Sequence, residues 1–327
     1  MRAIVIREPG GPEVMELRDV PTPEPSRGEV RVRIHASAVN RADLLQRLGM
    51  YPAPPGSPSD IPGIEIAGEV DTVGENVTEW KPGDRVFGIV GGGGYAEYIA
   101  LPARTLARIP DGMSFADAGA VPEAFLTAWD GMVDQGGLAA GETVLIHAVG
   151  SGVGTAAVQI ARAIGARSIG TARTSGKLDR ARELGLDEGI VVDGAGSFAD
   201  EVRRRTGGRG VDVVVELVGG SYVAQDLACI AAKGRIVVIG MMGGSRVDFD
   251  LGLLMRKRVE VRGTMLRSRP LEEKILAALA LDRHLAPLFA RGALKPIVDR
   301  VLPLASAAEA HRAMQSNETF GKVVLTV

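Results

Sequence analysis

The sequence has a single cysteine, few aromatic residues and almost no net charge. Cys229 is the one cysteine among 327 residues, aromatic residues make up 4%, and the formal net charge is −2. One cysteine excludes an intrachain disulfide, and the apolar stretch around it predicts that Cys229 is a buried helix residue. Proteins that bind nucleic acids usually carry a basic excess or aromatic stacking platforms, so we expect no nucleic-acid partner.

Long apolar runs are also missing. No run approaches the ~20 apolar residues that a membrane helix needs, so we expect no membrane partner. The N-terminal segment MRAIVIREPG alternates like a strand and does not follow the pattern of a signal peptide. These features predict a cytoplasmic protein, and a length of 327 residues exceeds one typical core and predicts two domains.

Two patterns divide the chain. Residues 1–122 are rich in Pro, Gly and Val, and short strand-like runs alternate there with turn signals, which predicts a β-rich domain. In residues 123–265, short apolar runs alternate with helical segments, which predicts an α/β fold with a doubly wound parallel sheet of the Rossmann type. Residues 266–327 contain a helical segment and end in the strand-like GKVVLTV, and we expect them to complete the β-rich domain, which is then discontinuous.

A glycine-rich turn follows the first strand of the predicted parallel sheet. The segment HAVGSGVG places glycines where a strand must turn into a helix, and the N-terminus of that helix favours a pyrophosphate. The spacing differs from GxGxxG, so the pattern depends on its position between a strand and a helix. The candidate cofactor-binding residues in this turn are Gly150, Ser151, Gly152 and Val153.

The end of the second predicted strand contains no acidic residue. Enzymes selective for NAD usually place Asp or Glu there to accept hydrogen bonds from the ribose. This chain reads GTARTSGK over residues 170–177, and its cations and hydroxyls suit the additional phosphate of NADPH. The candidates are Thr171, Arg173, Thr174, Ser175 and Lys177. Alternatively, the two cations only solvate the loop and the start of the next helix.

Several segments together match one family. SAVNRADLLQRLGMY, PGIEIAGEV, HAVGSGVGTAAVQIAR and GMMGG are spread over the chain. With them, the sequence resembles the medium-chain dehydrogenases/reductases, in particular the quinone oxidoreductase branch and its p53-inducible group. The resemblance implies a GroES-like catalytic domain, residues 1–122 and 266–327, and a Rossmann domain, residues 123–265. It also implies a homodimer formed through the edge strand RVEVRGT.

The same resemblance argues against a metal. Zinc-dependent relatives place cysteine and histidine where this chain has Asn40 and Arg41, and histidine where it has Ile64. We therefore expect no metal, and a structural role for Glu65. Without a Lewis acid, alcohol dehydrogenation is not expected, and the substrate should be electron-poor enough to accept hydride directly.

The resemblance also assigns site residues. Asn40 and Tyr51 are the catalytic candidates, and Tyr51 is expected to hydrogen-bond a quinone oxygen or donate a proton, unless it only covers apolar surface. Asp43 is expected to cap a helix or orient its neighbours. The further cofactor candidates are Thr127, Gly240, Met241, Met242, Arg267 and Lys322. For Arg267 a structural ion pair is equally expected. Val192 stands where the p53-inducible relatives have a tyrosine in the phosphate pocket, which weakens the expected preference for NADPH.

The sequence thus predicts a zinc-independent NADPH:quinone oxidoreductase whose substrate is a small quinone or another electron-poor acceptor. An alkene reductase acting on enones or enoyl thioesters is the nearest alternative. A cofactor-binding structural or RNA-associated protein with little turnover is an alternative of another class.

Overall fold

The computed structural model describes residues 1–192 and 197–327, which divide into two compact units. The first unit comprises Met1–Leu126 and Leu266–Val327, and the second unit comprises Thr127–Met265. The first junction, at 126/127, lies within helix α3 (Pro122–Trp129), and the predicted boundary at 122/123 falls at the start of the same helix. No helix in the described residues is both long and apolar enough to cross a bilayer.

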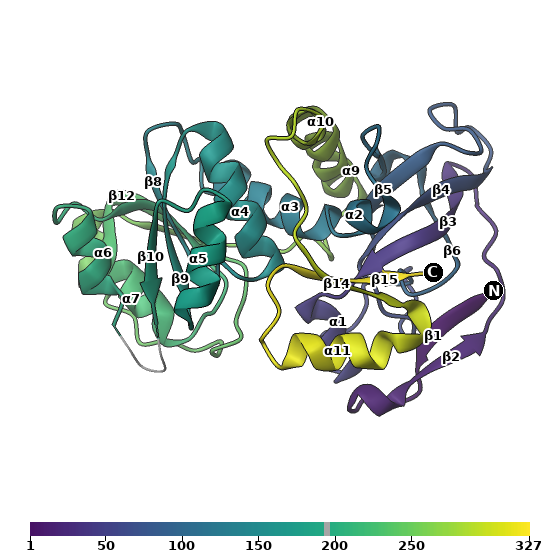
Figure 1. Ribbon diagram of the computed structural model, residues 1–327, viewed down its shortest axis with the longest axis horizontal. Helices are drawn as coiled ribbons and strands as arrows, with labels where there is room; N and C mark the ends of the chain where they lie inside the picture. Colours follow the sequence, from purple (N-terminus) through teal and green to yellow (C-terminus); the bar gives the residue numbers. More distant parts are fainter. Residues whose placement is uncertain (193–196) are drawn as a thin grey trace. The chain divides into compact units, whose positions relative to one another are not determined.

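A parallel sheet forms the centre of the second unit (Figure 1). Its strands are β8 (Thr143–Ile146), β9 (Arg167–Ala172), β10 (Glu188–Val191), β11 (Val211–Glu216), β12 (Ile230–Val238) and β13 (Glu260–Gly263). Within the described residues the strand order is β10-β9-β8-β11-β12-β13, and all neighbours are parallel. This order is that of a dinucleotide-binding Rossmann sheet, so the predicted fold class is confirmed and β13 lies at the sheet edge as predicted.

Helices cover both faces of this sheet. They are α4 (Gly152–Ile164), α5 (Ser175–Glu183), α6 (Ala199–Arg205), α7 (Ser221–Cys229) and α8 (Leu251–Lys257). Figure 1 shows α4 and α5 on one face and α6 and α7 on the other. Ser151 starts α4 by accepting a hydrogen bond from the Gly154 N–H at 3.0 Å, and Gly165 ends it in the left-handed conformation. Cys229 is the last residue of α7 and is buried, as predicted.

The first unit is built mainly from strands. They are β1 (Arg2–Ile6), β2 (Met15–Asp19), β3 (Glu29–Ala38), β4 (Glu65–Val73), β5 (Arg85–Ile89), β6 (Tyr98–Pro102), β7 (Ala107–Arg108), β14 (Val298–Pro303) and β15 (Lys322–Thr326). In the described part of this unit, one sheet has the order β14-β15-β3-β4-β5-β7, with β6 also paired to β3, while β1 pairs with β2. Val324 of β15 lies opposite Ala38 of β3, so the C-terminal segment completes the first unit as predicted.

The helices of the first unit position its polar residues. They are α1 (Arg41–Arg47), α2 (Phe115–Gly119), α3, α9 (Leu271–Ala280), α10 (Ala286–Ala290) and α11 (Ala307–Gln315). Along β3, Val30, Val32 and Ile34 are buried at alternate positions, as expected for a strand with one face in the core. Because α1 begins shortly after β3 ends, Asn40 lies between the end of a core strand and the start of a helix.

Candidate active site

Asn40 lies at the N-terminus of α1 and is 5% exposed. Its backbone N–H donates to Asp43 Oδ2 at 2.8 Å, so the carboxylate satisfies one of the free donors at the start of the helix. Asp43 therefore caps α1, as predicted. This local contact fixes the position of Asn40 relative to the helix.

The Asn40 side chain is held by a buried ion pair. Its Nδ2 donates to Glu65 Oε1 at 2.8 Å and to the Ala38 carbonyl at 3.1 Å. Lys322 Nζ lies 2.7 Å from Glu65 Oε1 and donates to Asn40 Oδ1. Burial opposes the charge on Lys322, but Glu65 and Glu123 outweigh it and raise the pKa of the lysine above its usual value. Lys322 is therefore a permanent cation among the carboxylates, and Glu65 has the structural role predicted for it.

A chain of hydrogen bonds connects Asp43 with Arg47. Tyr95 donates its O–H to Asp43 Oδ2 at 3.2 Å, and His311 Nε2 lies 3.3 Å from the same tyrosine oxygen. Arg47 lies 3.0 Å from His311 Nδ1. Because arginine only donates, the histidine accepts at Nδ1 and donates from Nε2 to Tyr95. Burial raises the pKa of Asp43 to about 6 and lowers that of His311 to about 3. At neutral pH, Asp43 is the acceptor at the end of this chain.

Tyr51 lies in the Pro/Gly-rich loop after α1, and Arg267 lies against its ring. The guanidinium carbon is 5.1 Å from the ring centre, and the same side chain donates to the carbonyls of Gly91 at 2.8 Å and of Tyr51 at 3.4 Å. It also donates to Gln46 Oε1. Burial raises the pKa of Tyr51 against the opposing effect of Arg267, so the phenol keeps its proton at neutral pH. Arg267 thus secures the Tyr51 loop through neutral acceptors rather than through an acidic partner.

In the second unit, the glycine turn has the close packing of a cofactor-binding turn. A Cβ atom on Gly154 would lie 2.3 Å from the Ala148 carbonyl oxygen, so only glycine allows α4 to approach β8 this closely. Ser151, Gly152 and Val153 are partly exposed at the N-terminus of α4. The backbone N–H groups and the helix dipole at this end favour a phosphate, so the described residues fit a dinucleotide.

The acid-free segment begins at the end of β9 and continues into α5. Arg173, Thr174 and Ser175 are exposed, and Lys177 is half-buried in the first turn of α5. The structure therefore brings two cations and two hydroxyl groups to the carboxyl end of the sheet, where such folds bind ligands. Val192, by contrast, is 3% exposed and belongs to the hydrophobic core.

Thr171 differs from its neighbours in this segment. It is 2% exposed, and its hydroxyl lies 2.9 Å from Nδ1 of the buried His147. The hydroxyl has a partner inside the second unit, and its predicted contact with the cofactor stays a prediction. Lys322, which is 4% exposed and paired in the first unit, likewise stays a predicted cofactor residue.

The loop after β12 presents two methionines. Met241 is 61% exposed and Met242 is 60% exposed. A Cβ atom on Gly240 would lie 2.4 Å from the Leu217 carbonyl oxygen, which explains the glycine at the start of this loop. Thr127 lies in α3 and is 7% exposed. These residues stay candidates for the cofactor on the predicted grounds.

Comparison with known proteins identifies the family. The model of the alcohol dehydrogenase GroES-like domain matches residues 26–111, and the model of the zinc-binding dehydrogenase matches residues 152–281. The quinone oxidoreductase of Homo sapiens is 33% identical over 99% of this chain and 97% of its own length. The chain belongs to the quinone oxidoreductase branch of the medium-chain dehydrogenases/reductases. The predicted family is therefore confirmed, and the chain is an oxidoreductase of this superfamily.

Two further matches show the range of relatives in this family. The crystal structure of Escherichia coli quinone oxidoreductase complexed with NADPH superposes with a TM-score of 0.89, at 30% identity over 100% of both chains. The phthioceranic/hydroxyphthioceranic acid synthase of Mycobacterium tuberculosis is 36% identical over 98% of this chain. The chain spans 15% of the length of that synthase.

One of the two matching families is that of the zinc-binding dehydrogenases. The residues around Glu65 in this chain do not fit a catalytic zinc ion. A catalytic zinc site needs three ligands from Cys, His, Asp or Glu. Glu65 lies 2.7 Å from the ammonium group of Lys322, and Glu123 Oε2 lies 3.9 Å from the same group. Asn40 and Ile64 supply no zinc ligand beside these two carboxylates, and the charge of Lys322 opposes a second cation at this position.

Sequence reasoning missed the contacts of three groups in this family member. It did not find the pairing of Lys322 with Glu65, the chain from Asp43 to Arg47, or the contacts of His147. Each of these groups joins residues from distant segments of the chain, so the spacing of residues along the sequence does not predict it. The available signal was the polar or charged residue inside an otherwise apolar strand, as at Glu65 and Lys322.

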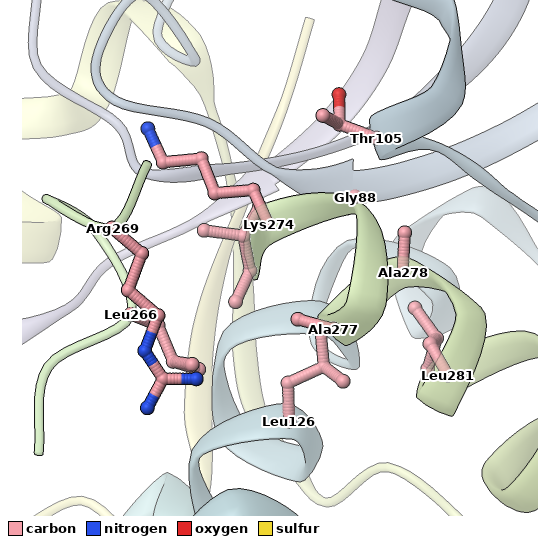
Figure 2. A pocket seen from close by; sticks show the side chains of 10 residues that line it. Gly88, Thr105, Leu126, Leu266, Arg269, Lys274, Ala277, Ala278 and Leu281 are labelled. Carbon is pink, nitrogen blue, oxygen red and sulfur yellow. The ribbon is translucent and has the colours of Figure 1, made fainter. Parts of the chain in front are cut away.

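A pocket in the first unit is lined by other residues (Figure 2). Figure 2 shows Lys274 and Arg269 beside the apolar side chains of Leu266 and Ala277. Burial, followed by the neighbouring Arg267, lowers the pKa of Lys274. The residues that line this pocket do not include Asn40, Tyr51 or any predicted cofactor residue. The pocket is therefore separate from the candidate site.

Proposed function

We propose that the chain is an NADPH-dependent, zinc-independent quinone reductase that works in the cytoplasm as a homodimer. The observation that carries the proposal is the end of β9, where two cations and no carboxylate follow the strand beside the glycine turn. The match to quinone oxidoreductases over the whole chain supports the quinone as acceptor.

The second unit would bind the cofactor. The glycine turn would bind the pyrophosphate, and Arg173 and Lys177 with the nearby hydroxyls would bind the additional phosphate. The proposed cofactor residues are Thr127, Gly150, Ser151, Gly152, Val153, Arg173, Thr174, Ser175, Lys177, Gly240, Met241 and Met242. When bound, NADPH supplies the hydride.

The first unit would hold the substrate. Tyr51 keeps its proton at neutral pH, so its phenol can donate a hydrogen bond to a quinone oxygen as negative charge develops there. Arg267 against the Tyr51 ring orients this donor. Asn40 has its side chain bonded to Glu65, Ala38 and Lys322, so we propose that it shapes the site rather than transfers a proton.

Steady-state rates test the acceptor. With NADPH, small quinones should be reduced at least about tenfold faster than enones of similar size. The match to an acid synthase favours the second candidate, reduction of enones or enoyl thioesters, because building long-chain acids commonly includes that reaction. Faster turnover of enones by a similar factor would replace the quinone with this alternative.

Tyr51→Phe tests the donor. We expect at least about a tenfold lower kcat, because a positioned acid usually contributes ~10²-fold or more. The matched control is Tyr98→Phe, since Tyr98 also has an arginine over its ring, with Arg31 at 5.7 Å. Equal effects of the two substitutions would remove Tyr51 from the mechanism.

The edge strand supports the homodimer. All four residues of β13 are exposed, and Val261 is 43% exposed on it. An exposed strand edge offers unpaired backbone groups to a second copy. Sedimentation velocity should give twice the monomer mass, and a monomer at micromolar concentration would contradict this part of the proposal.

A further inference from the structure

Three buried side chains of the second unit form a group of their own. His147 follows β8, Glu216 ends β11 and Asp226 lies on α7, and each is 0% exposed. His147 Nε2 is 2.8 Å from Asp226 Oδ1 and 3.8 Å from Glu216 Oε2. Among the described residues, no lysine or arginine forms an ion pair with either carboxyl group. The two carboxyl groups are therefore buried together without a cation.

The hydrogen-bond donors and acceptors of these three side chains show that one hydrogen is missing. His147 Nδ1 lies 2.9 Å from the Thr171 hydroxyl, and His147 Nε2 lies 2.8 Å from Asp226 Oδ1. We assign the tautomer in which Thr171 donates to Nδ1 and Nε2 donates to Asp226. In the turn that follows, Glu216 Oε1 accepts hydrogen bonds from the backbone N–H groups of Val218 and of Gly219, the latter at 2.8 Å. Glu216 Oε2 and Asp226 Oδ2 are buried and, within the part of the chain described, have no donor. The two carboxyl groups interact as hydrogen-bonding neighbours, so one hydrogen shared between them would satisfy both oxygens.

We propose that Glu216 and Asp226 share one proton and, with His147, act as positioning residues for the loops that bind the cofactor. The cofactor in this inference rests on the proposed function, whereas the shared proton does not. Burial favours a shared proton, because it raises the pKa of Glu216 to about 8, raises the pKa of Asp226 and lowers the pKa of His147 to about 4. The shared hydrogen therefore lies between Glu216 and Asp226, and His147 is neutral.

The group joins the ends of three strands. His147 precedes the glycine turn after β8, and Thr171 precedes the exposed segment that begins at Arg173. Glu216 holds the turn after β11, and a carbonyl of that turn accepts a hydrogen bond of 2.6 Å from the loop that contains Met241. Each segment proposed to bind the cofactor in these loops is thus tied to the same carboxyl pair.

The other titratable groups beside His147, Glu216 and Asp226 are not expected to change their protonation near neutral pH. The ring of Tyr222 lies 5.0 Å from that of His147, and burial raises the pKa of Tyr222 and of Cys229 on the same helix. The charged side chains that act on these two neighbours are Arg173, Lys257 and Arg203.

Thermal unfolding as a function of pH tests the proton. Both folded-state pKa values lie above the ordinary ones, so the stabilisation is complete below the ordinary pKa of a carboxyl group and is lost as pH rises from there through the raised folded-state values. The Tm of the wild type should fall by about 5 °C or more between pH 5 and 8. In Glu216→Gln the amide supplies the hydrogen at every pH, so most of this fall should disappear.

Two further variants complete the test. Asp226→Asn also supplies a permanent hydrogen, donated in the reverse direction, and should flatten the profile even if Glu216→Gln folds poorly. Glu142→Gln is the matched control, because Glu142 pairs with Arg235 in the same unit at 2.8 Å. It should lower the Tm and keep the wild-type fall with pH. A fall with pH that persists in both Glu216→Gln and Asp226→Asn overturns the proposal.

Cofactor affinity tests the positioning role. The Kd for NADPH should rise about fivefold or more from pH 6.5 to 9 in the wild type, and less than twofold in Glu216→Gln. If the wild type binds no NADPH while the Tm profiles behave as expected, the proposed cofactor fails and the shared proton stands. If NADPH binds with the same pH dependence in both proteins, the positioning role fails and the cofactor stands. His147, Glu216 and Asp226 each offer one possible ligand atom, and these atoms lie within 4.8 Å of one another. Stoichiometric zinc in the wild type that is lost in Glu216→Gln would therefore show that the group binds a metal ion and would overturn the shared proton.

Discussion

The two units neutralise their buried carboxylates by different means. In the first unit, Lys322 from the last strand lies 2.7 Å from Glu65, so a permanent cation balances the charge. In the second unit, Glu216 and Asp226 lie beside a neutral histidine, and one shared proton is the balance that we propose. A lysine keeps its charge over the physiological range, whereas a proton leaves as pH rises. The comparison thus contrasts a charge balance in the first unit that does not depend on pH around Glu65 with one in the second unit that does.

Lys322→Met should have the largest effect. It leaves Glu65 buried without its cation, and breaking such a pair costs about 3–5 kcal/mol in the free energy of unfolding. Urea denaturation measures this cost. Arg2→Met, which breaks an exposed pair with Glu97 at 2.9 Å in the same unit, should cost less than about 1 kcal/mol. Similar costs for the two variants would show that the buried cation has no special role.

Asp43→Asn and Asp226→Asn should differ at pH 7. Asp43 accepts from the N–H groups of Asn40 and Gly63 and from the Tyr95 hydroxyl, so an amide N–H₂ would meet only donors. We expect a loss of about 1–3 kcal/mol for Asp43→Asn. Asp226→Asn should lose less than about 1 kcal/mol, because its amide can donate to Glu216. Urea denaturation that gives the reverse order would contradict the proposed hydrogen assignment.

The double variant Arg173→Ala/Lys177→Ala should affect binding rather than stability. Removing these two cations near the proposed phosphate should weaken NADPH binding about 10–100-fold and NADH binding only slightly. Isothermal titration with both cofactors measures the difference. Arg180→Ala, an exposed arginine later in α5, is the control. Equal losses for NADPH and NADH would mean that these cations do not read the phosphate.

Much of the fold was predictable because its signals are local. Apolar runs alternating with helical segments predicted the parallel sheet, and β13 followed as its edge. The end of α7 at Cys229 is less local, because it is set by Ile230, which pairs with Val211 in the sheet. That pairing is a tertiary contact, and propensity does not reveal it.

The candidate site was predictable in its exposed parts and less so in its buried parts. The glycine turn and the Arg173 segment are read from consecutive residues. Thr171 belongs to the same segment, but its hydroxyl is turned to His147. The pairing of Lys322 with Glu65 was not predicted. Burial and distant partners decide such cases, and spacing in the sequence contains neither.

Carbon-13 NMR of the side-chain carboxyl groups tests the central comparison most directly. We predict that the Glu216 and Asp226 resonances shift together between about pH 6.5 and 9, because one proton leaves the pair. This transition should be absent in Glu216→Gln and unchanged in Lys322→Met. If both carboxyl groups are already ionised at pH 6.5, the second unit does not hold a shared proton, and the contrast between the two units is wrong.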